Sequence, residues 1–193
     1  MPPRLFLHKD FMNFSARRIA FTGLAGSGKS TAADYLVSKH RFHRLSYASP
    51  MKRMMRCMLI EAGAGLMEAV EMVDGKLKEV PTEFLAGKSP RYALQTLGTE
   101  WARDLIAQDI WRRILLHKVE MQAGHPVVVD DLRFADEAVG LKKAGFTIIR
   151  MCRNGSGTGS SHRSEGQEFD VDLTLDNDEE ISSLHAQLDV LIK

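Results

Sequence analysis

Cysteine is scarce in this chain, and its scarcity argues against two classes of protein. The 193 residues contain only Cys57 and Cys152, far apart and without a C-x-x-C spacing. This usage argues against a disulfide-bonded scaffold and against a cysteine-ligated metal cluster. Two separate thiols are typical of a reducing compartment, and we therefore expect a cytoplasmic protein.

Long apolar runs and an excess of one charge are also missing. Residues 1–18 contain no apolar run long enough for a signal peptide or a membrane span. The formal net charge is +1 at pH 7, so bulk electrostatics give no reason to expect a polyanionic partner. We expect neither a membrane nor a nucleic acid as partner. The length suits one domain, 1–193.

Glycine, by contrast, is concentrated in the stretch FTGLAGSGKST at 21–31. Gly23, Gly28, Lys29 and Ser30 match the pattern G-x-x-x-x-G-K-[ST] between an apolar run and a helix-like stretch. Glycines let successive backbone N–H groups turn toward an anion, and the helix N-terminus adds a favourable dipole. Lys29 is expected to reach the outer phosphates of a nucleoside triphosphate, and the Ser30 hydroxyl to ligate Mg²⁺. The alternative is a glycine-rich turn that caps an ordinary helix.

Strand-like and helix-like stretches alternate along the chain. Apolar runs typical of strands lie at 18–23, 43–49, 126–131, 146–152 and 171–177. Helices are expected at 29–40, 50–62, 90–107, 109–122, 134–144 and 178–192. This alternation predicts an α/β fold, in which helices cover both faces of a five-stranded parallel sheet to make three layers. The wholly apolar run VVV within 126–131 is typical of an inner strand of a parallel sheet rather than an edge strand.

Two segments depart from this alternation. Residues 63–89 are rich in glycine and charge, and we interpret them as a partly helical insertion. Residues 153–168, RNGSGTGSSHRSEGQE, are rich in glycine and serine and cannot bury much apolar area. We expect 153–168 to form a mobile lid that closes over a bound nucleotide. A solvated linker between two strands is the alternative.

Two adjacent acids follow the apolar run PVVV. Phosphoryl transfer requires an acidic group near Mg²⁺, usually at the carboxyl end of a buried strand, and Asp130 and Asp131 occupy such a position. Neighbouring side chains on a strand point to opposite faces, so we assign Asp130 to the metal and Asp131 to the side of the phosphate acceptor. The alternative is that one of them caps the helix that begins near Phe134.

Large apolar side chains in two helix-like stretches are assigned to the core. Four methionines at helical spacing predict a core-facing stripe: Met51, Met54, Met55 and Met58. Trp101 and Trp111 are likewise expected in the core rather than stacked on a nucleotide base.

Five blocks in this order are similar to a known family: GLAGSGKST, SYASPMK, LQTLGTEWARDLIAQDIW, VDDLRFADEA and HRSE…DLTLDND. They resemble those of the phage-type deoxynucleoside monophosphate kinases, from Arg18 to the C-terminus. The resemblance implies a P-loop NTPase fold with strand order 2-3-1-4-5, ATP and Mg²⁺ as cofactors, and small nucleotides as substrates. It also implies that 50–107 is a region that binds the monophosphate. Whether the chain forms a homodimer is left open.

The resemblance also implies roles for individual residues. The phosphates of ATP would be held by Gly23, Ala25, Gly26, Ser27, Gly28, Lys29, Ser30 and Thr31. The monophosphate pocket would be shaped by Tyr47, Lys52, Arg91, Gln95, Glu100 and Arg103. Asp131 and Arg133 would lie between donor and acceptor, and Arg150, Arg153 and Arg163 near the closing lid. Lys29, Asp131, Arg133 and Arg163 are therefore the candidate catalytic residues. One departure is Ser49, which stands where the family often has aspartate, and it leaves the preferred base undetermined.

Arginine forks bind phosphate bidentately, so several arginines are expected to converge on the reacting groups. Arg91 and Arg103 are twelve positions apart, which is roughly 18 Å along a continuous helix. They cannot grip one phosphate together unless the helix breaks between them, for example near Gly98. Each therefore remains a candidate by itself, with a surface salt bridge as the alternative. Arg163 in the lid is expected to act like an arginine finger.

These observations favour an ATP-dependent kinase of (deoxy)nucleoside monophosphates. A kinase of another small phosphorylated acceptor, such as phosphomevalonate, fits the same D-x-R arrangement. A nucleotide-hydrolysing switch protein is a third hypothesis, although the chain has no clear N-K-x-D guanine motif.

Overall fold

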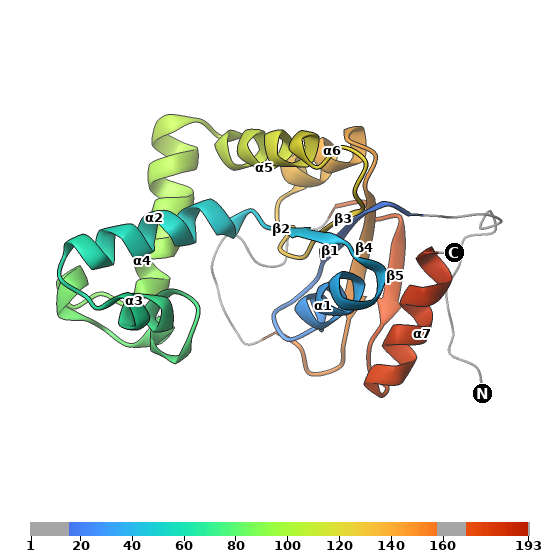
Figure 1. Cartoon of the computed structure of the whole chain (residues 1–193), viewed down its shortest axis with the longest axis horizontal. Coiled ribbons are helices and arrows are strands. Elements are labelled where there is room, and N and C mark those ends of the chain that lie inside the picture. The colour runs from blue at the N-terminus through green and yellow to red at the C-terminus, as the bar shows by residue number, and fades with distance from the viewer. Residues whose placement is uncertain (1–15, 158–168, 193) are drawn as a thin grey trace. The chain divides into compact units, whose positions relative to one another are not determined.

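The computed structural model describes residues 16–157 and 169–192, and these divide into two compact units (Figure 1). The first unit comprises the residues up to Ser46 together with those from Arg112 onward. The second unit is the intervening segment from Tyr47 to Trp111. Each unit is described by itself.

The first unit is built on a five-stranded sheet in which every neighbouring pair is parallel. Its strands are β1 (Arg18–Thr22), β2 (His43–Leu45), β3 (Val127–Val129), β4 (Thr147–Cys152) and β5 (Leu173–Asp176). Their order is β2-β3-β1-β4-β5, so the predicted α/β class, parallel sheet and strand order are confirmed. The buried run of β3 lies inside the sheet between β2 and β1, as its three valines predict.

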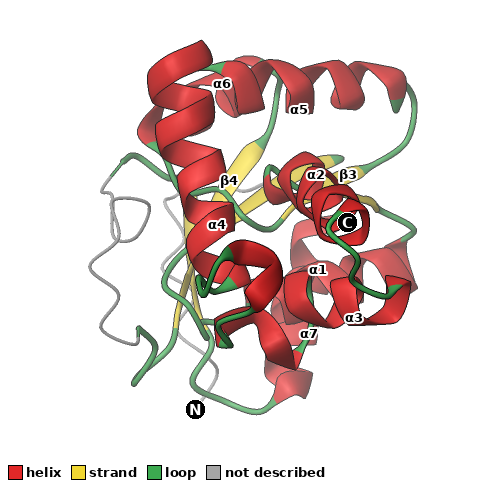
Figure 2. Cartoon of the chain, turned by 90° about the vertical axis from the view of Figure 1, so that its left-hand side faces the viewer, coloured by secondary structure: helices red, strands yellow, loops and turns green. Residues whose placement is uncertain are grey.

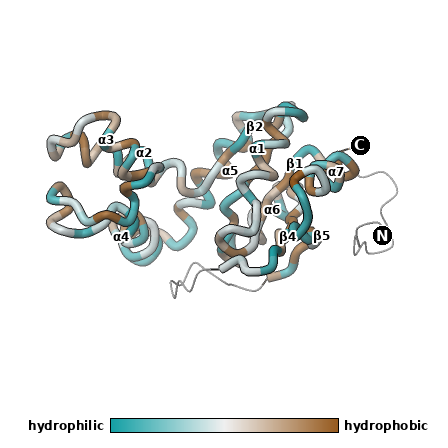
Figure 3. Tube along the Cα trace, turned by 90° about the horizontal axis from the view of Figure 1, so that it is seen from below, coloured by the Kyte–Doolittle hydropathy of each residue, from teal (hydrophilic) through white to brown (hydrophobic). Residues whose placement is uncertain are grey.

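Helices cover both faces of this sheet. They are α1 (Lys29–His40), α5 (Ile110–Met121), α6 (Ala135–Lys143) and α7 (Ile181–Ile192). Leu36 of α1 and Leu188 of α7 pack in one core with Phe21 and Ile149 of the central strands. Figure 1 shows α1 and α7 on one side of the strands and α5 and α6 on the other. Figure 3 marks the apolar residues of β1 and β4 in brown.

The second unit is helical (Figure 2). It consists of α2 (Ala48–Glu61), α3 (Leu66–Val73), η1 (Lys76–Glu79), η2 (Glu83–Leu85), α4 (Pro90–Thr96) and η3 (Leu97–Ile106). Its core is made by Met55 and Leu59 of α2 against Met72 and Val73 of α3. The chain passes from α4 into the π-helical turns of η3 without a break near Gly98. The condition under which Arg91 and Arg103 could share one phosphate is therefore not met.

Four expectations differ from the structure in detail. The second strand ends at Leu45 rather than at 49, because Tyr47 already has helical φ and ψ and α2 begins at Ala48. The last helix begins at Ile181, three residues later than expected. The core assignment is wrong for the exposed side chains of Met54 and Met58 and for Trp101, which is also exposed.

The prediction that Trp111 lies in the core is confirmed. Its ring is buried, and its indole N–H donates a 2.8 Å hydrogen bond to the carbonyl of Gly98. Among residues 16–157 and 169–192, no helix is both long enough and apolar enough to cross a membrane.

Candidate functional site

The glycine-rich loop at 23–28 connects β1 to α1, and its backbone uses conformations that favour glycine. Gly23, Gly26 and Gly28 have φ values of 132°, 81° and 98°. A Cβ atom on Gly23 would lie 2.3 Å from the carbonyl oxygen of Met151, and one on Gly28 would lie 2.2 Å from Nδ2 of Asn177. Both glycines are thus required by close neighbours as well as by φ.

The first turn of α1 follows this loop directly. Gly28 occupies the N-cap position, and glycine has no side chain with which to cap the helix. The first backbone N–H groups of a helix have no partner within the helix, and together with the helix dipole they favour an anion. Ser27 is buried, whereas the side chains of Ser30 and Thr31 are exposed at this end.

Lys29 folds back onto the loop. Its ammonium donates to the carbonyl oxygens of Gly23 at 2.8 Å and of Leu24 at 2.7 Å. The amine is therefore held on the loop by these two carbonyl groups. Ala25 and Gly26 are exposed at the tip of the loop.

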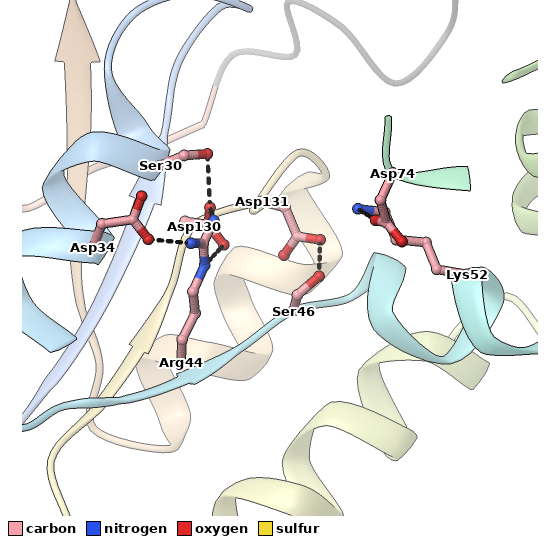
Figure 4. A network of polar contacts seen from close by, with 8 residues as sticks. All are labelled: Ser30, Asp34, Arg44, Ser46, Lys52, Asp74, Asp130 and Asp131. Carbon is pink, nitrogen blue, oxygen red and sulfur yellow. Dashed lines mark hydrogen bonds and ion pairs between the residues drawn. The ribbon is translucent and has the colours of Figure 1, made fainter. Parts of the chain in front are cut away.

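Asp130 lies beside the start of α1, immediately after β3 (Figure 4). The hydroxyl of Ser30 donates to Oδ2 of Asp130 at 3.0 Å. Arg44 of β2 donates from Nε to Oδ1 of the same carboxylate at 3.1 Å, and its NH2 group donates to Oδ2. The third nitrogen of the guanidinium donates to Asp34 of α1 at 2.6 Å. One arginine therefore joins two carboxylates, and the Asp130 side chain is only 6% exposed.

Arg44 is a site residue that sequence reasoning missed. Burial by itself would lower the pKa of Arg44, but the hydrogen bonds and negative charge of Asp130 outweigh burial and raise the pKa. The side chain is therefore a permanent cation beside the buried acid. The signal for it is the strand register, which pairs Arg44 with Val128, two residues before Asp130. That register is not readable from the sequence by itself.

Asp131 has a different neighbour. It accepts a 2.8 Å hydrogen bond from the hydroxyl of Ser46, which follows β2 (Figure 4). Arg133 is exposed in the connection to α6. The backbone N–H groups of Arg133 and Phe134 donate to the buried carboxylate of Glu137, at 3.1 and 3.2 Å. Glu137 thus binds the backbone at the start of α6, where the sequence offers one of the two aspartates as an alternative cap.

The segment after β4 contacts the loop at 23–28. The backbone N–H of Gly157 donates to the carbonyl of Ala25 at 3.0 Å. Asn154 donates from its backbone and its side chain to Asp178, each at 2.6 Å. Arg153 is exposed beside them. Arg163 and the greater part of the predicted lid, 158–168, lie outside the described residues.

In the second unit, two basic side chains meet one acid. Lys52 of α2 forms an ion pair with Asp74 at 2.8 Å, and Arg56 forms another with the same carboxylate at 3.2 Å. Tyr47 is buried at the N-cap of α2. An anion approaching Lys52 would therefore compete with Asp74.

The other candidates of this unit lie on α4 and η3. Arg91 forms an exposed ion pair with Glu79 at 2.5 Å, which is the surface salt bridge that the sequence interpretation weighed. Arg103 is buried and donates to the carbonyl of Gln108 at 3.2 Å. Gln95 is half-buried and Glu100 is exposed.

Comparison with known proteins bears on the whole chain. No protein-family model matches it. A protein of Acanthamoeba polyphaga mimivirus, described as "Putative deoxynucleotide monophosphate kinase", is 29% identical to it over 184 residues. The alignment covers 88% of this chain and 93% of that protein. The similarity therefore extends far beyond the glycine-rich loop.

Proposed function

We propose that this chain is an ATP-dependent kinase that transfers the γ-phosphoryl group of ATP to a deoxynucleoside monophosphate, forming ADP and the diphosphate. Similarity to the viral protein along nearly the full length supports a nucleotide kinase. The observation that carries the proposal is the contact between Ser30 and Asp130, because it joins the 23–28 loop and α1 to the acid that follows β3. Phosphoryl transfer requires phosphate-binding groups and an acid side by side.

The donor phosphates would be bound by the loop and the start of α1. Backbone N–H groups from Gly23 to Thr31 would surround them, and Lys29 would leave the carbonyls of Gly23 and Leu24 for the outer phosphates. Those two carbonyls accept hydrogen bonds from Lys29, so the ammonium already lies within reach of the loop. Its positive charge would stabilise the charge that develops on the transferred group.

The donor set beside the loop fits Mg²⁺. The hydroxyl of Ser30 and the carboxylate of Asp130 are oxygen ligands that lie 3.0 Å apart. Among the residues that the structure describes, no three His, Cys, Asp or Glu side chains gather closely enough to hold a metal by themselves. Mg²⁺ commonly takes only one or two protein oxygens together with substrate phosphates. When bound, Mg²⁺ would neutralise charge on the β- and γ-phosphates. Arg44 would then either share the Asp130 carboxylate with the metal or keep only its hydrogen bond to Asp34.

The residues proposed to bind the acceptor monophosphate are those that the family resemblance implies. Asp131 and Arg133 are proposed to lie between donor and acceptor. The proposed pocket residues on the second unit are Tyr47, Lys52, Arg91, Gln95, Glu100 and Arg103. The lid arginines Arg153 and Arg163 are proposed to contact the phosphates in the closed state. Because an acceptor phosphate has low proton affinity, no strong general base is required, and these groups would act by orientation and charge.

A coupled assay of ADP formation tests this function. We expect rapid ADP formation with ATP and Mg²⁺ only when one of dAMP, dGMP, dCMP, dTMP or dUMP is present, and the ribonucleotides test the sugar. Equal ADP formation without any acceptor would point instead to a hydrolysing switch protein. Activity with phosphomevalonate but with no nucleotide would point to a kinase of another phosphorylated acceptor.

A further inference from the structure

The carbonyl groups of the 23–28 loop accept hydrogen bonds from two sets of donors. Lys29 donates to the carbonyls of Gly23 and Leu24. In addition, the backbone N–H of Gly157 donates to the carbonyl of Ala25, and the amide Nδ2 of Asn177 donates to the carbonyl of Ser27 at 3.0 Å. A loop that binds an anion directs its N–H groups inward, so its carbonyl groups must find donors outside.

Asn177 is seated against the last turn of this loop. It follows β5, its side chain is buried, and its backbone N–H donates to the carbonyl of Cys152 at 2.7 Å. The same Nδ2 atom occupies the space that a Cβ on Gly28 would need, at 2.2 Å. The amide therefore both bonds the carbonyl before Gly28 and packs on Gly28 itself.

The hydrogen bonds from Lys29 and from Asn177 respond differently when a nucleotide binds. Lys29 must release its carbonyl partners to contact phosphate, and Leu24 is exposed, so water can replace the ammonium there. The carbonyl of Ser27 is buried with Asn177 as a donor. A buried carbonyl without a donor is costly, so we expect the hydrogen bond from Asn177 to Ser27 to persist when the nucleotide binds.

We propose that Asn177 is a positioning residue for the donor phosphates. Its amide keeps the Ser27 carbonyl turned outward and the Gly28 turn in its left-handed conformation, so that the N–H groups around Lys29 stay directed at the phosphates after Lys29 has left the loop. This role rests on the proposed function, because it presumes that the loop binds ATP. Asn177 itself touches the loop and no reacting atom.

The structure provides a matched pair of variants for the test. N177D keeps the size of the side chain but replaces the donating NH₂ with an oxygen that faces the carbonyl of Ser27. Gln187 of α7 is also a buried amide near the end of β5, and its Nε2 donates to the carbonyl of Asp176 at 3.4 Å. Q187E makes the same chemical change at a carbonyl outside the loop, so it controls for general destabilisation.

Binding of ADP, measured by calorimetry, is expected to weaken by at least about tenfold in N177D, because the free loop is no longer held in the conformation that binds phosphate and ADP binding must restore it. We expect less than about a twofold change in Q187E. In steady state, N177D should raise the KM for ATP and leave the KM for the monophosphate unchanged. ADP affinity equal to that of the unmodified chain in N177D would overturn the proposal, since a residue that only fills space tolerates an isosteric change.

Amide hydrogen exchange of residues 24–30 in the ligand-free protein separates this proposal from the proposed function. Exchange there should become faster in N177D and stay unchanged in Q187E. If the unmodified chain binds no ADP, the proposed function is wrong. Unchanged exchange in N177D would overturn the positioning role of Asn177 whether or not ADP binds. Should N177D not fold, N177A removes the donor without adding a charge. Wild-type exchange and ADP affinity in N177A would then refute the role of the amide.

Discussion

Replacing Arg44 with methionine would remove the cation that neutralises Asp130. The Asp130 carboxylate is 6% exposed and receives two of the three charged hydrogen bonds that Arg44 makes. The third goes to Asp34, which is mostly exposed, and contributes little. Methionine retains most of the apolar stem of arginine, so the change isolates the charge.

The expected loss follows from the burial of the two partners. Breaking a fully buried ion pair costs about 3–5 kcal/mol, because one charge is left uncompensated. Arg44 is 35% exposed, so water can approach Asp130 once the guanidinium is gone, and the cost is smaller. We expect about 2 kcal/mol for R44M at neutral pH, between that limit and the value for exposed pairs. For a chain of this size, that lowers Tm by roughly 4–8 °C.

Thermal unfolding followed by circular dichroism measures this loss in the ligand-free protein. K142M is the matched control, because Lys142 pairs with Asp172 in the same unit and is 37% exposed, while its acid is 38% exposed. The two variants therefore remove cations of similar exposure from acids of very different exposure. We expect K142M to cost no more than about 0.5 kcal/mol. A Tm for R44M within about 1 °C of that for K142M would refute the reasoning.

Three further predictions concern other groups. K29A should lower kcat for phosphoryl transfer at least about a hundredfold while leaving Tm nearly unchanged, and a wild-type kcat would contradict the assignment of the loop. The pKa of Asp189 is lowered, chiefly by a hydrogen bond from Lys39, so its stabilising effect is present above the unfolded pKa of about 3.9 and is lost as pH falls toward the lower folded pKa. The difference in Tm between the unmodified chain and D189N should therefore become smaller below about pH 4. A difference as large at about pH 3 as at neutral pH would show that the ionised Asp189 carboxylate is not its cause. Burial, followed by the charge of Asp176, raises the pKa of the Cys152 thiol, so a thiol reagent at mildly alkaline pH should label the exposed Cys57 first, and rapid labelling of C57S would contradict this.

Much of the fold and the loop was predictable because the signals are local. The strand–loop–helix sequence around Gly28 and Lys29 specifies positive φ values and a helix start within a few neighbouring residues. The valines of β3 predict an inner strand for the same reason, since burial on both faces selects an uninterrupted apolar run. The exposed Met54 and Met58 show the limit, because helical spacing predicts a common face but not which face is covered.

The sequence by itself determined the candidate phosphate loop, the alternation of strands and helices, and the acids that follow β3. These features depend on residues close together in the chain, whose backbone preferences and apolar periodicity act locally. Only the tertiary structure decided what surrounds them: Arg44 meets Asp130 across 86 positions, and Asn177 meets Ser27 across 150. Such contacts depend on strand order and register, which bring distant side chains to one edge of the sheet.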